Sequence, residues 1–370
     1  MNYKQLLKIT FVTSIISRII SLLLYYLSSS GKTRLWNNWV LNTFDHYQLG
    51  ILLILASSFL STKHTKALFV GIGFGLIIDE FNQLLNIISF DKIPYTYNTV
   101  LDWLLTLIAL GVFLLICVYK IKNIVGQKKY FRDGKFSYIV AGKGKPLIFL
   151  HGYGVSPYCF SSLIRKLSKS FLVIAPFMSS GWKKSNTKNS SGFASFCSHL
   201  AKLIGKLKLK KPMVVGYSMG GLPATILSLS YPQKVSRLVV IDGVATTPDK
   251  NILRVTFGIV TELISITFIK NGFSLVVSIC LEFLINLIFH PLVLIQHVFY
   301  LYKTKPVLKK LSKETLILWG RKDEVLSIDY GIRLHKMIKT SQLEIVDNGH
   351  FWALINPKRA VSKINNFVVN

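Results

Sequence analysis

The spacing of hydrophobic and polar residues changes between residues 120 and 132. Before this point, long apolar runs are interrupted by few charged residues. After it, short apolar runs of strand length alternate with stretches of helical periodicity, which is typical of a mostly parallel α/β sheet. We therefore predict an all-α domain at 1–125 and an α/β domain at 126–370.

Four apolar segments in the first domain approach the roughly 20 residues that a helix needs to cross a bilayer core. They are residues 9–27, 47–60, 67–81 and 101–121. Arg18 lies near the middle of the first segment, where a charged side chain costs about 3 kcal/mol on insertion. That segment is therefore either a span, a signal anchor or an interfacial helix.

Four spans would make this chain a multi-pass integral membrane protein. Lys and Arg residues concentrate in the loops on one side of the four segments, and such a bias marks the cytoplasmic side of a membrane. Both termini and the second domain are therefore predicted to be cytoplasmic. This orientation depends on the count of four spans.

Polar residues of the first domain allow two interpretations. The titratable groups at or near membrane depth are His46, His64, Asp79 and Glu80. They form either a metal or proton site or a set of side chains at headgroup level, and we favour the second. Gly71 and Gly75 have a spacing that suits close helix packing, whereas a phosphate loop would need a preceding strand.

Seven apolar runs of the second domain have the length of β-strands. They are residues 136–142, 146–152, 171–177, 212–218, 236–242, 315–320 and 342–347. Helices are expected at 157–169, 193–209, 219–230, 328–338 and 351–367. Ligands of such sheets bind at the carboxyl ends of the strands, and chemically active residues follow four of these runs: His151, Ser218, Asp323 and His350.

Four short motifs resemble those of the α/β-hydrolase superfamily. They are HGYG at 151–154, GYSMG at 216–220, WGRKDE at 319–324 and DNGHF at 347–351. The order Ser, Asp, His along the chain is also that of the superfamily. The resemblance covers residues 130–370 and implies an α/β-hydrolase fold with a mostly parallel sheet and a helical cap.

The resemblance implies a role for each residue of the motifs. Ser218 would be the nucleophile, His350 the base that takes its proton, and Asp323 the group that orients the imidazole. The backbone N–H groups of Met219 and Tyr153 would form the oxyanion hole.

Other side chains at the same strand ends have competing interpretations. Glu324 and Asp242 are alternatives to Asp323 as the acidic member, and we favour Asp323 from its position in the W-G-x-x-D motif. His151 is expected to brace the oxyanion loop. Ser218 as an ordinary turn serine is the alternative to a nucleophile.

The interval between Asp242 and Thr315 corresponds to the cap of the superfamily. Residues 245–311 include the apolar runs 252–269 and 273–302, interrupted by a few charged and histidine residues. We expect amphipathic cap helices that line a hydrophobic pocket and touch the bilayer. The loop at 175–179, Ala-Pro-Phe-Met-Ser, departs from the Asp and Gly-rich turn of many relatives, which weakens any substrate analogy.

Charge and cysteine content narrow the possible partners. Of a net charge of +29, residues 1–127 contribute +5 and residues 128–370 contribute +24. No zinc spacing, recognition-helix pattern or aromatic RNA-binding strand accompanies this charge, so anionic lipid is a better partner than nucleic acid. The four cysteines form no CxxC pair and suggest neither a disulfide framework nor a metal site.

The sequence thus predicts a membrane-anchored serine hydrolase that cleaves an ester, or alternatively a thioester or amide, of a lipid-like acyl group. It requires no metal or organic cofactor. Two other hypotheses stay open: a non-catalytic membrane protein that binds a lipid or a partner on a hydrolase scaffold, and an acyltransferase in which an alcohol replaces water.

Overall fold

The computed structural model describes residues 3–29, 46–57, 60, 62–81, 85, 100–122, 125–133, 136–178, 192–248, 252–270 and 272–369. Contacts divide the chain into two compact units, Met1–Lys122 and Asn123–Asn370. The division falls three residues before the boundary that we predicted from the change in pattern. Residues 41–45 and 82–84, which adjoin the predicted segments 47–60 and 67–81, and Ser179 lie outside the described residues.

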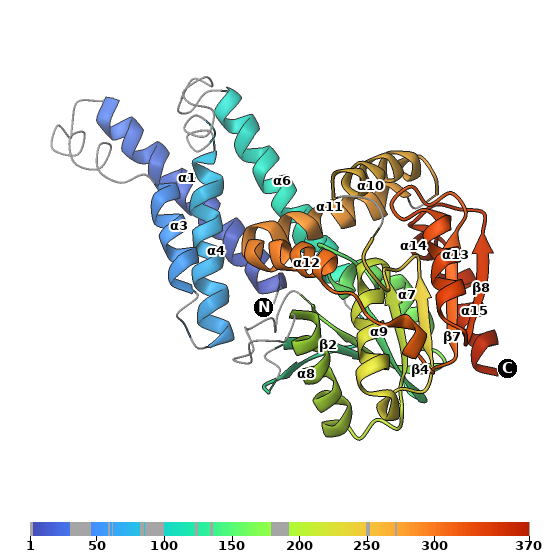
Figure 1. Cartoon of the computed structure of the whole chain (residues 1–370). Coiled ribbons are helices and arrows are strands. Elements are labelled where there is room, and N and C mark those ends of the chain that lie inside the picture. Colours follow the sequence, from blue (N-terminus) through green and yellow to red (C-terminus); the bar gives the residue numbers. More distant parts are fainter. Residues whose placement is uncertain are drawn as a thin grey trace. The chain divides into compact units, whose positions relative to one another are not determined.

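The first unit consists of helices in its described part (Figure 1). They are α1 (Tyr3–Ser29), α3 (His46–Ala56), α4 (Lys63–Asp79) and α6 (Val100–Lys122). Each coincides with one of the four predicted apolar segments, and α4 packs against the other three.

Glycines allow α4 to approach its neighbours closely. A Cβ on Gly75 would lie 2.5 Å from Thr13 Cβ of α1, and one on Gly73 would lie 2.6 Å from the carbonyl oxygen of Gly50 in α3. Hydroxyl groups of α1 donate across the same contact to the carbonyl oxygens of α4, from Thr10 to Gly71 at 3.1 Å and from Ser14 to Gly75 at 3.1 Å. The predicted role of Gly71 and Gly75 in close helix packing is confirmed.

Arg18 is buried inside this unit together with a carboxylate. Its Nε lies 2.8 Å from Oδ1 of Asp79, and its Nη2 donates to the Asp79 carbonyl oxygen at 2.6 Å and to Thr106 Oγ1 at 2.7 Å. Ser17 donates to the other carboxylate oxygen of Asp79 at 2.6 Å. The charge of Arg18, which made the first segment doubtful as a span, is therefore compensated by a residue of another helix.

Two of the other candidate groups, His46 and Glu80, lie beside that pair. His46 Nδ1 is 3.3 Å from Glu80 Oε1 and 3.6 Å from Asp79 Oδ2. The side chain of His64 lies outside the described part. Within the residues that the structure describes, no group of three or more His, Cys, Asp or Glu side chains is arranged to hold a metal ion.

The helices of the first unit turn large apolar side chains outward. On α1, residues Phe11, Ile15 and Ile19 are 42–59% exposed, whereas Ser14 and Arg18 are buried. Nevertheless, no single helix in the described ranges is both long enough and apolar enough to cross a membrane, so the four predicted spans are not supported by this criterion. Among the helices that the structure describes, only Gly272–Leu287 and Pro291–Lys303 of the second unit reach the required length and hydrophobicity together, as a pair bent by 102°.

In the residues that the structure describes, the second unit is built on an eight-stranded sheet of order β1-β2-β4-β3-β5-β6-β7-β8. The strands are β1 (Gln127–Phe131), β2 (Phe136–Ala141), β3 (Lys145–Leu150), β4 (Phe171–Pro176), β5 (Met213–Tyr217), β6 (Leu238–Ile241), β7 (Thr315–Gly320) and β8 (Ser341–Val346). The pairs β1–β2 and β2–β4 are antiparallel and all other pairs are parallel. This is an α/β-hydrolase fold with a mostly parallel sheet.

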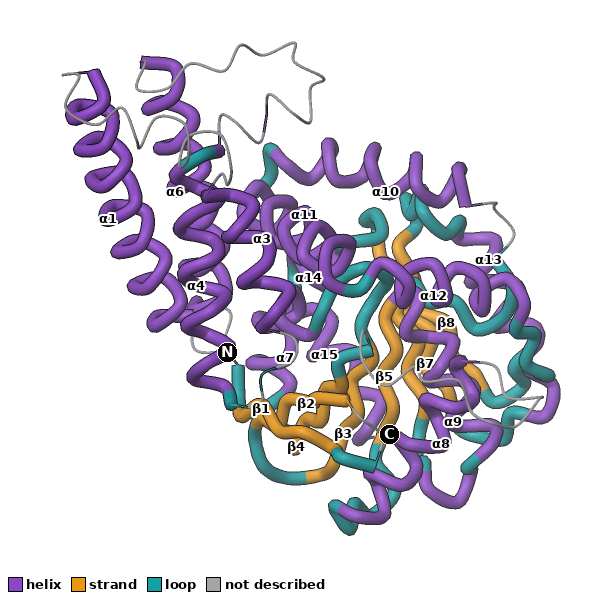
Figure 2. Tube along the Cα trace, turned by 90° about the vertical axis from the view of Figure 1, so that its left-hand side faces the viewer, coloured by secondary structure: helices purple, strands orange, loops and turns teal. Residues whose placement is uncertain are grey.

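Helices cover both faces of the sheet, which explains why its central strands are continuously apolar. In β3, Ile148 and Leu150 pack into one core layer, and Leu147 and Phe149 pack into the other. Figure 2 shows the strands between two layers of helices. The first layer contains α8 (Gly192–Lys206), α9 (Gly221–Ser230) and α13 (Ile328–Met337), and the second contains α7 (Ser161–Leu167), α14 (Trp352–Ile355) and α15 (Pro357–Val369).

The register of the sheet places the four motif loops at one edge. Leu150 at the end of β3 pairs with Gly216 of β5, and Gly320 at the end of β7 pairs with Val346 of β8. Because these strands are parallel, the loop after β3 begins next to the loop after β5, and the loops after β7 and β8 begin side by side.

The described residues of the cap form three helices, α10 (Ile252–Thr267), α11 (Gly272–Phe289) and α12 (Pro291–Lys303). The apolar run at 273–302 is divided because Pro291 starts a new helix, at a position where its missing N–H costs nothing. The pattern also missed β1, whose first four residues are exposed and mostly polar. A paired edge strand of that kind does not have the apolar character on which strand prediction relies.

Candidate active site

Ser218 stands at a sharp turn between β5 and α9. Its φ is +52°, in the left-handed region that side chains rarely adopt, and this backbone strain lifts the residue out of the strand. The turn is compact, since a Cβ on Gly216 would lie 2.5 Å from the carbonyl oxygen of Gly220, and one on Gly220 would lie 2.2 Å from that of Leu150. Both positions therefore require glycine.

The structure brings Ser218, His350 and Asp323 together. His350 Nε2 lies 3.0 Å from Ser218 Oγ, and His350 Nδ1 lies 2.7 Å from Asp323 Oδ2. An ionised carboxylate can only accept hydrogen bonds, so Nδ1 carries a proton, and a neutral imidazole then presents the lone pair of Nε2 to the serine hydroxyl. This is the geometry that a serine nucleophile and its base require.

Further hydrogen bonds hold these two partners of the serine in place. The other oxygen of Asp323 accepts from the N–H of Leu326 at 2.7 Å, and the hydroxyl of Tyr217 donates to the carbonyl oxygen of His350 at 2.7 Å. Asp323 and His350 are 6% and 2% exposed. Their low exposure strengthens the interaction of the two charges, because little water screens them.

The alternative carboxylates are engaged elsewhere. Asp242 accepts from the N–H of Gly320 and from Nε1 of Trp352, each at 2.6 Å, so it links two strand ends within the core. Burial raises the pKa of Asp242 well above its usual value, and the nearby charge of Asp323 raises it further. Glu324 Oε2 accepts from Thr261 at 2.9 Å. Of these three acidic residues, Asp323 is the one whose carboxylate is hydrogen-bonded to His350.

Surrounding charges set the proton affinity of His350. Burial by itself lowers the pKa of the imidazole, but the charge and hydrogen bond of Asp323 raise it, with further contributions from Asp242 and Glu262. The net result is a pKa of about 9, raised from the ordinary value of 6.5. Three carboxylates therefore stabilise the imidazolium form that appears when the serine is deprotonated.

Of the two predicted oxyanion residues, Met219 directly follows Ser218, and Tyr153 belongs to a loop that approaches it. Met219 lies in the short helix η3 (Ser218–Gly220), and a Cβ on Gly152, next to Tyr153, would lie 3.4 Å from Ser218 Cβ. The hydroxyl of Tyr153 donates to the carbonyl oxygen of Leu294 in the cap at 3.5 Å. The use of the two backbone N–H groups by an oxyanion stays a prediction.

His151 braces the loop after β3. Its Nε2 accepts from the N–H of Met178 at 3.0 Å, so Nδ1 carries the proton and donates to the Gly152 carbonyl oxygen at 2.9 Å. Burial lowers the pKa of His151 to about 4, with partial opposition from the Gly152 hydrogen bond, and the ring is neutral at pH 7. Its place in the structure is that of a brace rather than a base.

Two residues of the cap contact the loops of the active site, although we did not predict them from the sequence. Asn286 of α11 donates to the carbonyl oxygen of Gly154 at 3.2 Å. Glu262 of α10 accepts from the N–H of His350 at 2.6 Å and from that of Glu324 at 2.9 Å. In the sequence, Glu262 is recognisable only as an isolated acidic residue within an apolar run, and this pattern does not identify the groups that it contacts.

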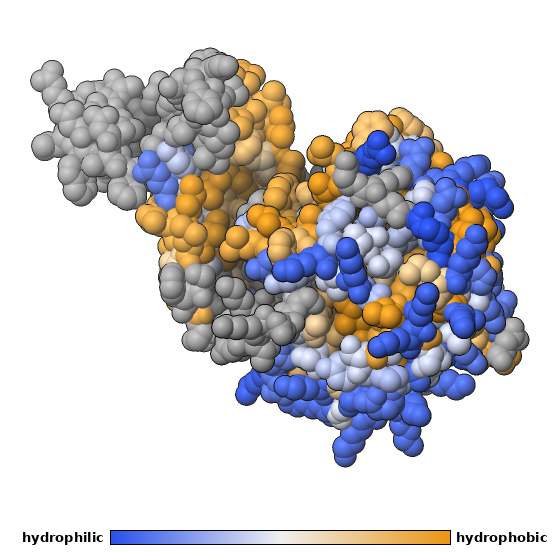
Figure 3. Space-filling model, viewed as in Figure 1, coloured by the Kyte–Doolittle hydropathy of each residue, from blue (hydrophilic) through white to orange (hydrophobic). Residues whose placement is uncertain are grey.

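The cap helices differ from our expectation of a hydrophobic lining. Along α10, the apolar residues Leu253, Phe257 and Ile264 are 61–76% exposed, whereas Glu262 is buried. On α11 and α12, the polar residues Ser278, Glu282, Asn286 and His297 are also buried, together with apolar Ile279, Leu294 and Leu301. The inward face of the cap is therefore mixed, and much of its apolar surface points outward (Figure 3).

The cysteine thiols that the structure describes take no part in this arrangement. Cys159, Cys197 and Cys280 form no disulfide within the described residues, and the side chain of Cys117 lies outside them. Burial raises the pKa of the Cys197 thiol, so it stays protonated and unreactive at neutral pH.

Comparisons with known proteins agree with the fold. A family model described as the alpha/beta hydrolase fold matches residues 145–258. The chain is 25% identical over 248 residues to the 2-hydroxy-6-oxo-2,4-heptadienoate hydrolase of Pseudomonas putida. The aligned region covers 61% of this chain and 90% of that protein.

Solved structures share the same architecture. The 2-hydroxy-6-oxo-6-phenylhexa-2,4-dienoate hydrolase of Rhodococcus sp. strain RHA1 superimposes with a TM-score of 0.55 at 20% identity, over 66% of this chain and 99% of that one. A structure described as a membrane phospholipase A superimposes with a TM-score of 0.54 at 16% identity, over 77% and 97% of the two chains. At these identities the likeness concerns the fold alone.

Proposed function

We propose that this α/β-fold hydrolase is a membrane-anchored serine hydrolase that cleaves an ester of an apolar acyl group through an acyl-enzyme. The observation that carries the proposal is the hydrogen-bonded series Ser218–His350–Asp323, at 3.0 and 2.7 Å, on a strained turn at the carboxyl edge of the sheet. An ordinary turn serine would need neither the strain nor a buried imidazole at its hydroxyl.

The reaction follows from this geometry. Ser218 Oγ attacks the carbonyl carbon of the substrate while its proton moves to His350 Nε2. The N–H groups of Tyr153 and Met219 stabilise the oxyanion, and each such donor typically contributes roughly 3 kcal/mol to the lowering of the barrier. His350 then gives the proton to the departing alcohol oxygen, which leaves the acyl group on Ser218.

Hydrolysis of the acyl-enzyme repeats these steps with water. His350 Nε2 takes a proton from the attacking water, and the collapse of the second intermediate returns that proton to Ser218 Oγ. Asp323 stays ionised throughout and stabilises the imidazolium. An alcohol in place of water would make the same site an acyltransferase.

The distribution of side chains supports attachment to a membrane and a lipid-like substrate. In the first unit, charged and hydroxyl side chains such as Arg18, Asp79 and Thr106 are buried, whereas Ile19, Leu55 and Leu107 are about 60% exposed. Water-soluble helical bundles have the reverse arrangement, because exposed apolar surface is unfavourable in water. Figure 3 shows apolar side chains over the first unit and over parts of the cap.

A fluorophosphonate probe tests the catalytic proposal. We expect the full-length protein in membranes to be labelled, and Ser218→Ala to abolish the labelling. Ser312→Ala, which removes an exposed hydroxyl away from the site, is the matched control and should be labelled like the wild type. Labelling that persists in Ser218→Ala would contradict the assignment of the nucleophile.

A substrate panel then tests the acyl preference. We expect p-nitrophenyl esters of medium and long acyl chains to be hydrolysed faster than the acetate ester, and a diacylglycerol in mixed micelles to be a substrate. A 2-hydroxy-6-oxo-dienoate completes the panel, since a related protein is a hydrolase of that class. Preference for the acetate ester or the dienoate would refute a lipid-like substrate, and ester formation with added alcohols would identify an acyltransferase.

A further inference from the structure

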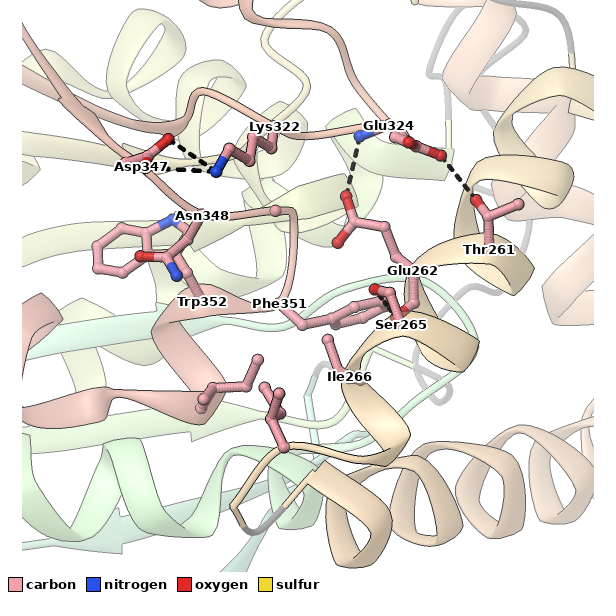
Figure 4. A pocket seen from close by; sticks show the side chains of 13 residues that line it. Thr261, Glu262, Ser265, Ile266, Lys322, Glu324, Asp347, Asn348, Phe351 and Trp352 are labelled. Atoms are coloured by element: carbon pink, nitrogen blue, oxygen red, sulfur yellow. Dashed lines mark hydrogen bonds and ion pairs between the residues drawn. The ribbon is translucent and has the colours of Figure 1, made fainter.

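Glu262 is an acidic residue of the cap, and its side chain points toward the loops that follow β7 and β8. It lies on α10, opposite the exposed apolar side chains of Leu253 and Phe257, and is 4% exposed. Figure 4 shows its carboxylate pointing away from α10 toward the loop that contains Glu324. A buried carboxylate needs hydrogen-bond donors to offset the loss of hydration.

Backbone N–H groups from two loops supply those donors. Oε2 of Glu262 accepts from the N–H of His350 at 2.6 Å, and Oε1 accepts from the N–H of Glu324 at 2.9 Å. One N–H belongs to the residue that carries the imidazole, and the other belongs to the residue directly after Asp323. A single carboxylate thus links the loop of the base to the loop of the acid.

Two glycines provide the space that this link requires. A Cβ on Gly349 would lie 2.4 Å from Glu262 Oε2, so the residue before His350 must lack a side chain for the carboxylate to fit. A Cβ on Gly258, one helical turn before Glu262, would lie 2.4 Å from the carbonyl oxygen of Glu324, so α10 rests directly on the acid loop. Thr261 adds a hydrogen bond to the Glu324 carboxylate at 2.9 Å.

We propose that Glu262 is a positioning residue: its carboxylate holds the His350 loop and the Asp323 loop at the separation that the triad needs, so that the active site is complete only when α10 is seated. This inference rests on the proposed serine hydrolase function. Glu262 acts through the backbone of its neighbours and touches none of the reacting atoms.

The electrostatic environment provides a second signature of this role. Glu262 lies close enough to His350 to help raise the pKa of the imidazole, along with Asp323 and Asp242. Burial raises the pKa of Glu262 itself, and the N–H groups of His350 and Glu324 oppose that rise. Glu262 also lines a pocket together with Lys322 and Asp347. These two charged residues pair with each other, with 3.3 Å between Nζ and Oδ1.

Glu262→Gln removes the charge and keeps the shape. Its amide oxygen can accept from one N–H, but its NH₂ group would face the other, so one loop is released. We expect kcat to fall about ten- to hundredfold, since small misplacements of catalytic groups have effects of this size. KM should change by less than about threefold, because the substrate contacts are retained. The midpoint of the kcat/KM profile against pH should also move to lower pH.

Two further variants separate positioning from charge. Glu262→Asp keeps the charge but shortens the reach, and it should lower kcat while preserving the pH midpoint better than Glu262→Gln does. Glu314→Gln makes the same charge change at the opposite end of β7, where the carboxylate pairs with Arg237 at 2.7 Å, and should behave like the wild type. An unchanged kcat in Glu262→Gln, or a change confined to KM, would overturn the inference.

Hydrogen exchange on the full-length protein gives a readout that does not depend on activity. In Glu262→Gln and Glu262→Ala, amide exchange should become faster in peptides covering 321–326 and 347–351, and not in peptides of β5. If the wild type is not labelled at Ser218, the proposed function fails, and the exchange experiment still decides whether Glu262 links the loops. Unchanged exchange in both variants would refute the link.

Discussion

At the scale of single residues, the candidate site depends on a few side chains whose neighbours adjust their protonation. His350 must be neutral to accept the proton of Ser218, yet adjacent carboxylates raise its pKa to about 9. The protonated form therefore predominates at neutral pH, and the fraction of competent base increases as the pH rises. Asp323, Glu262 and Asp242 thus stabilise the transition state and at the same time reduce the population of free base.

This balance predicts the pH dependence of the reaction. We expect kcat/KM to rise with pH and to level off above about 9, because this parameter reports the pKa of the free enzyme. Asp323→Asn removes the strongest contribution that raises the pKa, so the midpoint should shift to lower pH, and kcat should fall by about 10⁴-fold as the tautomer is lost. A steady-state titration with a soluble ester measures both quantities.

The same shift has a consequence for stability. Because the folded-state pKa of His350 is raised above its ordinary value of 6.5, the stabilisation from its ion pair is complete below that value and is lost as the pH rises through about 9. A wild-type melting temperature that falls over this interval relative to that of Asp323→Asn would agree with this. If the melting temperatures of the two proteins changed with pH in the same way, this contribution of the ion pair would be refuted.

At the scale of elements, the helices of the first unit are joined by polar groups that lie far apart in the chain. Arg18 of α1 and Asp79 of α4 form a buried pair at 2.8 Å, with side chains 6% and 0% exposed. Each charge would be costly alone in such surroundings, and the pair also fixes the register of the two helices. The glycines of α4 serve the same contact by allowing the backbones to approach.

Replacing one partner of the pair should destabilise the first unit more than replacing both partners. Arg18→Met leaves the Asp79 carboxylate buried without its cation, at a cost of roughly 3–5 kcal/mol, whereas the double variant Arg18→Met/Asp79→Leu recovers most of that loss. Thermal unfolding of the full chain in detergent micelles, followed by circular dichroism, compares the two. A double variant that is no more stable than Arg18→Met would show that the pair is not coupled in this way.

At the scale of the whole molecule, the two units differ in what they expose. The first unit exposes apolar residues such as Phe11, Leu52 and Leu104. The second carries most of the positive charge, 35 basic against 11 acidic residues in 128–370. Apolar surface and positive charge are the two features that favour association with an anionic bilayer.

Fractionation tests this association. We expect the full-length protein to remain in the membrane pellet after washing with high salt and with alkaline carbonate, and to be released by detergent. High salt removes proteins held by charge alone, since it screens such interactions. Release by salt would indicate that the positive charge of the second unit alone holds the protein at the membrane. Recovery in the soluble fraction without treatment would refute membrane attachment.

Much of this organisation was predictable from local patterns. The apolar runs identified seven of the eight strands, because strands covered by helices on both faces are continuously apolar. The motifs around Ser218, Asp323 and His350 identified the residues that the fold brings together. β1 was missed because its first four residues are exposed and mostly polar.

What the sequence by itself determined is therefore what depends on neighbours along the chain: the strand and helix pattern, the glycine turn around Ser218 and the division into two compositions. Only the tertiary structure decided which distant groups meet. It selected Asp323 rather than Asp242 or Glu324 as the partner of His350, and it brought Glu262 to two loops more than sixty residues away. The physical reason is that an isolated acid in an apolar run must find donors, but its own neighbours do not specify where they lie.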